Sequence, residues 1–149
     1  MREFRTEDTE STEGNVNEIS GMIVDAAVRV HRELGPGLLE SVYEVVLADA
    51  LREHGLAVAR QVPIPIRFRG KLFEEGFRAD LIVEERIIVE IKSVEQLARV
   101  HKKQVLTYLK LSGLKLGLLI NFGGELLKGN IERLVVGPIP NLKSPPCPP

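Results

Sequence analysis

Residues 77–92 decide the fold, and they read FRADLIVEERIIVEIK. Two apolar runs meet at the polar segment 84–86, which is typical of a tight hairpin turn. Alternate residues of a strand share a face, so Glu90 and Lys92 point to the same side of the second strand. A register that pairs position 80 with position 90 would place Asp80 beside Glu90. Because charged groups on an apolar hairpin cost free energy unless they pair or bind a ligand, the hairpin is a candidate metal site.

The candidate ligands suit a hard divalent cation. Mg²⁺ prefers oxygen ligands in near-octahedral order and keeps several waters. Asp80 and Glu90 could supply two carboxylate oxygens, and the carbonyl of Ile91 a third. Lys92 could hold or activate a water that attacks a phosphodiester, while the metal lowers the pKa of that water and stabilises charge on the phosphate. The alternative is an edge hairpin with a solvated Glu–Lys pair, since this spacing alone occurs in many unrelated proteins.

Two helices are predicted before the hairpin. Helical spacing runs over 16–34 and is stopped by Gly-Pro-Gly at 35–37. The next helix, 38–54, carries one apolar stripe of Leu39, Val42, Tyr43, Val46, Leu47, Ala50 and Leu51. Glu40 lies at the edge of that stripe, where its carboxylate could reach the same ion or a second one. The alternative is a first-turn Glu favoured by the helix dipole.

The rest of the chain alternates strands with one helix. An edge strand is indicated over 58–68 because it contains two prolines. A helix over 96–111 is ended by glycine, a short apolar strand covers 115–122, and a last strand covers 131–136. Helices on both sides of a central mixed sheet, an α/β sandwich, is the predicted architecture.

The third helix offers a substrate-side pair. Gln104 and Tyr108 stand four residues apart and therefore share a helix face. An amide and a phenol can hold phosphate oxygens without demanding a base sequence, although a half-buried Tyr with a Gln at its rim is commonplace. His31 and His101 lack the spacing of metal ligands. Basic residues that could form a backbone-binding rim are Arg67, Arg69, Lys71, Arg99, Lys102, Lys103 and Lys110.

Length and composition indicate how the chain is divided into domains. The 149 residues, 44% of them hydrophobic, suffice for one domain with one core. We expect an acidic disordered segment at 1–15, a domain at 16–137 and a Pro-rich tail at 138–149. With 20 basic and 21 acidic residues, the chain lacks the strongly basic balance of many nucleic-acid binders. The single Cys147 excludes an internal disulfide, and without an apolar span or a targeting signal a cytoplasmic protein is expected.

Together these residues resemble the PD-(D/E)XK nuclease superfamily, and within it a small bacterial group named for a Gly-x-x-Glu-x-x-Tyr motif. That motif occupies residues 37–43, the superfamily core matches Asp80 with residues 90–92, and residues 104–108 match a Gln-x-x-x-Tyr element. Ala79 stands where the superfamily's eponymous proline would be. The resemblance covers about 16–136, nearly the whole globular part.

The resemblance implies a restriction-endonuclease-like sandwich whose metal lies at the hairpin. It assigns Glu40, Asp80 and Glu90 as metal ligands for Mg²⁺ or Mn²⁺, and Lys92 as the catalytic lysine. Gln104 and Tyr108 would be substrate-binding. We therefore predict a metal-dependent nuclease that hydrolyses DNA through a metal-activated water, with a preference for structure or ends rather than sequence.

Two other functional classes remain open from the sequence. One is a non-catalytic module that binds nucleic acid, a nucleotide or a protein on the same fold. The other is a structural protein whose hairpin charges pair with one another. DNA versus RNA, endo- versus exonuclease action, one metal ion or two, and a homodimer or protein partner also stay open.

Overall fold

The computed structural model describes residues 5–137, so the prediction for the Pro-rich tail 138–149 lies outside the described residues. Its elements, in chain order, are α1 (Arg5–Leu34), α2 (Glu40–Glu53), β1 (Val58–Phe68), β2 (Lys71–Val83), β3 (Ile87–Lys92), α3 (Arg99–Ser112), β4 (Leu116–Asn121) and β5 (Ile131–Val135). Within this part of the chain, none of the helices has the length and apolarity that a membrane crossing needs.

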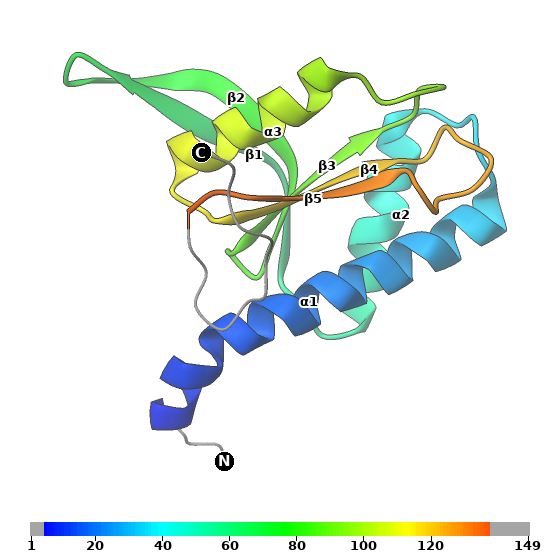
Figure 1. Cartoon of the computed structure of the whole chain (residues 1–149), viewed down its shortest axis with the longest axis horizontal. Helices are drawn as coiled ribbons and strands as arrows, with labels where there is room; N and C mark the ends of the chain where they lie inside the picture. The colour runs from blue at the N-terminus through cyan, green and yellow to red at the C-terminus, as the bar shows by residue number, and fades with distance from the viewer. Residues whose placement is uncertain (1–4, 138–149) are drawn as a thin grey trace.

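The strands form one five-stranded sheet in the order β1-β2-β3-β4-β5. β3 and β4 are parallel and the other neighbours are antiparallel, so the sheet is mixed. The parallel pair requires a crossover connection, which α3 provides. Helices α1 and α2 lie together on one side of the sheet and α3 lies on the other (Figure 1). The predicted α/β sandwich with a central mixed sheet is confirmed.

Two cores follow from these layers. The larger core joins α1 and α2 to side chains such as Leu81, Val89 and Ile91 of the sheet. The smaller core joins α3 to the opposite side, through side chains such as Ile88 and Leu119. β3 and β4 contribute to both cores and are buried along almost their whole length. This double coverage explains why their sequences are continuous apolar runs rather than alternating ones.

The hairpin between β2 and β3 turns as predicted. Glu84 and Glu85 have φ values of 54° and 56°. Two consecutive left-handed residues are the requirement of a type I′ turn, whose twist matches that of the flanking strands. The turn sets the register, in which residue 81 pairs with 89, 82 with 88 and 83 with 87.

Three helix starts differ from the sequence prediction. α1 begins at Arg5, so residues 5–15 are helical where a disordered segment was expected. That segment contains no proline, and a helix anchored by packing further along extends readily through a polar sequence. α2 and α3 begin at Glu40 and Arg99, slightly later than expected. At α3, the ring of His101 accepts a hydrogen bond from the Ala98 N–H (3.0 Å), which fixes the first turn.

The buried stripe of α2 is rotated from the one predicted. Leu39 is 74% exposed although the pattern placed it in the stripe. The buried residues are Tyr43, Glu44, Leu47, Ala48 and Leu51. The stripe thus includes a carboxylate, because Glu44 has polar partners on β1 that compensate its burial. Glu40 lies one turn before Glu44 and so on the sheet-facing side of the helix.

Candidate active site

The candidate site lies where the backbone hydrogen bonding between β2 and β3 ends. The pairing of the strands ends at Leu81 and Val89. At the next position, side chains replace the backbone ladder. The Asp80 N–H donates to Oε2 of Glu90 (2.8 Å), and the Ile91 N–H donates to Oδ2 of Asp80 (2.8 Å). Each carboxyl group is therefore fixed by a backbone donor, and Asp80 and Glu90 lie beside each other as the predicted register requires.

Burial strongly affects the ionisation of this pair. Glu90 is only 5% exposed. Burial first, and then the negative charge of Asp80, raise the pKa of Glu90 to about 8, against the lowering effects of the Asp80 N–H and of Lys92. Burial also raises the pKa of Asp80, although the hydrogen bond from the Ile91 N–H opposes this. Without a cation, Glu90 therefore keeps its proton at neutral pH.

Two other predicted residues lie close to the pair. The charge of Lys92 lowers the pKa of both Asp80 and Glu90. Tyr108 approaches from α3, and burial followed by the charges of Glu90 and Asp80 raises its pKa. The ring of Phe77 packs against Tyr108 with 4.7 Å between centroids, which holds the phenol in place. The other half of the predicted substrate pair, Gln104, is exposed one turn earlier on α3.

Glu40 reaches the same region from α2. Its Oε2 accepts a hydrogen bond from the N–H of Ser93 (3.2 Å), the residue directly after Lys92. The hydroxyl of Ser93 donates to the carbonyl of Leu38 (2.7 Å), so the start of α2 is tied to the end of β3. A cavity of about 610 Å³ lies against Glu40 and Ser93. Glu40 also contributes to the raised pKa values of Asp80 and Glu90, which places its charge within reach of theirs.

Glu44 is a polar residue of this region that the sequence analysis missed. It accepts hydrogen bonds from Nε of Arg60 (3.0 Å) and from Nε2 of Gln61 (2.8 Å). The same Gln61 amide lies 3.4 Å from Oδ1 of Asp80 and links the two carboxylates. The charge of Glu44 also raises the pKa of Asp80. The available signal was its position four residues after Glu40, on the same helix face.

Gln61 reaches both carboxylates because of its backbone conformation. Its φ of 51° is left-handed, which is uncommon for a residue other than glycine and usually has a structural or functional cause. Before it, Arg60 points to Glu44 of α2, whereas Ile64 beyond it packs into the core under α3. Side chains of β1 therefore face α2 before Gln61 and α3 beyond it, and this change occurs directly beside Asp80.

The loop that follows Lys92 is held by Asn121, a second residue that the sequence analysis did not single out. Oδ1 of the fully buried Asn121 accepts the N–H groups of Val94 (2.9 Å) and Gly123 (3.0 Å), and its Nδ2 donates to Asn130 (3.0 Å). A Cβ at Gly123 would lie 2.2 Å from the carbonyl oxygen of Val94, so only glycine fits there. Nothing in the pattern around an Asn at the end of an apolar strand marks this role.

His31 and Tyr43 are structural. The hydroxyl of Tyr43 donates to the carbonyl of Gly35 and accepts from the N–H of Leu38 (3.2 Å). Its ring stacks on Phe122 at 4.4 Å and 8°. The ring of His31 is buried and its Nε2 bonds the carbonyl of Gly124 (2.9 Å). Both residues fix the loop from which Glu40 starts.

The predicted residues are thus brought together to different degrees. Asp80, Glu90, Lys92 and Tyr108 form one cluster, Glu40 lies at its border, and Gln104 faces solvent. Among the side chains that the structure describes, at 16–74 and 76–137, no three His, Cys, Asp or Glu converge closely enough to hold a metal ion. The donor set still fits a hard divalent cation, because the adjacent carboxyls of Asp80 and Glu90 each use one oxygen for a backbone N–H, while the second oxygen of Asp80 has only a long contact of 3.4 Å with the Gln61 amide.

An α/β sandwich that holds paired carboxyl groups where a hairpin opens, with a lysine on the same strand, offers groups for acid–base chemistry and oxygen ligands for a divalent cation. Residues 17–134 match the model of a family described as the PD-(D/E)XK nuclease superfamily, and the chain belongs to that family. Membership supports a nuclease-type function, nucleic acid as the ligand and a divalent metal as the cofactor. No curated protein and no solved structure gives a significant match.

Proposed function

We propose that the chain is a Mg²⁺- or Mn²⁺-dependent nuclease that hydrolyses phosphodiester bonds of DNA and prefers particular structures or ends over particular sequences. One observation carries the proposal: Asp80 and Glu90 are locked side by side by backbone N–H groups of the opposite strand. Catalytic groups must be held in a productive arrangement before substrate arrives. Two carboxyls that are kept adjacent by backbone donors, in surroundings that disfavour charge on both, meet that requirement.

The metal ligands in this proposal are Asp80 and Glu90, and Glu40 would become the third by turning its side chain toward them, since the three carboxyls do not converge in the described part of the structure. A bound divalent cation would supply positive charge that stabilises the phosphate and makes a water more acidic. The chain must first release the proton of Glu90, because burial and Asp80 hold its pKa near 8. Affinity for the cation should therefore increase with pH over the neutral range.

The remaining site residues act on the substrate. Lys92 shares the strand of Glu90 and is half-buried beside both carboxyls, where an ammonium can orient a water or a phosphate oxygen. Tyr108 offers a phenol at the edge of the cluster, and Gln104 an exposed amide one turn away. Neither side chain discriminates between bases when it contacts the backbone, which supports a preference for structure or ends.

Calorimetric titration of Mg²⁺ and Mn²⁺ tests the metal site, and cleavage of labelled single-stranded, duplex and flapped DNA tests the reaction. The variants are Asp80→Asn combined with Glu90→Gln, and Lys92→Ala. Glu85→Gln is the matched control, because Glu85 is an exposed carboxylate on the same hairpin. We expect the double variant to lose metal binding and cleavage together, and Lys92→Ala to lose cleavage while it retains the metal.

Two results would contradict the nuclease proposal. If correctly folded wild type binds neither cation, the carboxyl pair has only a structural role. If wild type binds a cation and DNA but cuts none of the substrates, the chain is a non-catalytic binding module on the same fold.

A further inference from the structure

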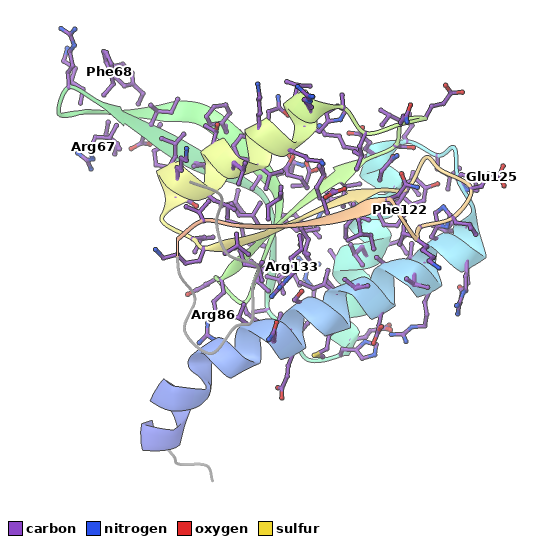
Figure 2. All side chains as sticks on the ribbon, viewed as in Figure 1. Arg67, Phe68, Arg86, Phe122, Glu125 and Arg133 are labelled. Atoms are coloured by element: carbon purple, nitrogen blue, oxygen red, sulfur yellow. The ribbon has the colours of Figure 1, made fainter. Side chains whose placement is uncertain are left out.

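The hairpin that joins β1 to β2 projects from the body of the protein (Figure 1). We call residues 66–73 the arm. Residue 66 pairs with 73, 67 with 72 and 68 with 71, so the two strands stay hydrogen-bonded to the tip. Figure 2 shows the side chains of Arg67 and Phe68 at its far end, away from both helical layers.

The arm combines exposed apolar and basic side chains. Phe68, Leu72 and Phe73 are 58%, 48% and 47% exposed. Arg67, Arg69 and Lys71 carry three positive charges, and residues 66–73 contain no acidic residue. The guanidinium of Arg69 lies 5.2 Å from the centroid of the Phe68 ring, a cation–π contact at the tip. Large apolar side chains left in solvent at the end of a projecting hairpin indicate a binding surface.

The arm is continuous with the strand that carries Asp80 of the candidate active site. Ile64 pairs with Phe77, and Ile66 with Phe73. The register shifts between these two pairs, so the regular alternation of β2 is interrupted between Phe73 and Phe77. Phe77 packs against Tyr108. The arm is therefore joined to the candidate active site by one continuous strand, β2, which carries Phe73, Phe77 and Asp80.

We propose that the arm is a second nucleic-acid contact, in which Phe68 and Phe73 stack on unpaired bases while Arg67, Arg69 and Lys71 hold the phosphates. Aromatic side chains combined with a positively charged surface are the usual means of binding single strands without sequence preference. The inference rests on the proposed function and deepens it, because it names unpaired bases at ends or junctions as the feature that the protein recognises.

The structure also gives the distance between the arm, which would bind the unpaired bases, and Asp80, where the DNA would be cut. Seven residues separate Phe73 from Asp80 along β2, which corresponds to about 20 Å at the rise of a strand. Along duplex DNA, in which each strand rises about 3.4 Å per nucleotide, that length spans roughly six base pairs. Cleavage should therefore fall about six nucleotides from the junction that the arm engages.

Two other partners fit the arm less well. A second copy of the chain would bring two sets of Arg67, Arg69 and Lys71 together, and Pro63 and Pro65 on β1 hinder pairing at this sheet edge. An anionic membrane would satisfy the charges and the exposed rings. It would not explain why the arm extends from the strand that carries Asp80.

Fluorescence anisotropy with labelled single-stranded, forked and blunt duplex DNA, in EDTA to prevent cutting, tests the proposal. Phe68→Ala with Phe73→Ala should weaken binding of single-stranded and forked DNA at least about tenfold and affect blunt duplex less. Arg67→Ala, Arg69→Ala and Lys71→Ala together should reduce the slope of log affinity against log salt by about two. The matched controls are Leu126→Ala and Lys128→Ala, which remove an exposed apolar and an exposed basic side chain from another loop.

Wild-type affinity in the folded arm variants would overturn the proposal. Loss of dimers in sedimentation, or loss of binding to phosphatidylserine vesicles, with DNA affinity unchanged would assign the arm to self-association or to a membrane. Calorimetry and cleavage on the same samples separate this inference from the nuclease proposal. If the arm variants lose DNA binding and wild type cuts no substrate, the arm inference is supported and the nuclease proposal is refuted. If the arm variants bind DNA as wild type does and wild type cuts it, the nuclease proposal is supported and the arm inference is refuted.

Discussion

Replacing Glu90 by Gln should make the metal-free protein more stable at alkaline pH. The pKa of Glu90 rises from 4.5 to about 8 on folding. Between these two values the unfolded chain has lost the proton that the folded chain retains. The stability that this proton binding provides is complete below pH 4.5 and is lost as pH rises through about 8.

The expected magnitude follows from the size of the shift. Each pH unit in this window lowers the free energy of unfolding by about 1.4 kcal/mol when the two states differ by one proton. The full window is therefore worth about 4–5 kcal/mol, an upper value because other groups share the field of the site. Gln has the same shape and a carbonyl that can accept the Asp80 N–H, but it has no charge to bury.

The assay is urea unfolding followed by far-UV circular dichroism from pH 5 to pH 8 in EDTA, since the chain contains no Trp for fluorescence. Wild type and Glu90→Gln should have similar stability at pH 5, and the variant should exceed wild type by roughly 3 kcal/mol at pH 8. Glu85→Gln, at an exposed position, should follow wild type throughout. Parallel curves for wild type and Glu90→Gln would refute the reasoning, because burial would then impose no cost on the charge of Glu90.

Further predictions concern stability and the metal. Asp80→Ala should lower the free energy of unfolding by about 1–3 kcal/mol because the Ile91 N–H loses its acceptor, and Asp80→Asn should cost less, as urea unfolding can measure. Asn121→Ala leaves the Val94 and Gly123 N–H groups without their acceptor and should cost about 2–4 kcal/mol, with amide hydrogen exchange increased at both. Tyr43→Phe should cost about 1 kcal/mol by thermal unfolding, because the ring still stacks on Phe122 while the bonds to Gly35 and Leu38 are lost. Mn²⁺ at about 100 times its dissociation constant should stabilise wild type by about 2.7 kcal/mol in thermal unfolding, and the Asp80→Asn, Glu90→Gln protein should not respond.

The sequence predicted the architecture and the adjacency of Asp80 and Glu90 because both depend on local patterns. The hairpin at 77–92 specifies its turn, its register and the adjacency of Asp80 and Glu90. The bounds of β1 matched because the prolines and the alternating pattern mark an edge strand.

The residues that were missed depend on long-range contacts. The role of Glu44 arises from Arg60 and Gln61, which are distant in sequence, and burial of a carboxylate contradicts the apolar pattern on which the stripe was based. Asn121 acts through a loop that follows a different strand. The reach of the arm depends on how far β1 and β2 extend together beyond the body, whereas the sequence placed its basic residues only at a turn.

The carboxyl groups of Asp80 and Glu90 close the gap that the opened ladder leaves between β2 and β3. Selection for folding alone would therefore preserve an acid or its amide at these positions in a descendant that no longer cuts nucleic acid. Among the side chains that the structure describes (16–74 and 76–137), Lys92 makes no hydrogen bond or salt bridge, and only its longer-range attraction acts on Asp80 and Glu90, so folding places less demand on Lys92 than on the two acids. Among related chains, replacement of Lys92, rather than of Asp80 or Glu90, would therefore distinguish a protein that has lost nuclease activity from one that retains it.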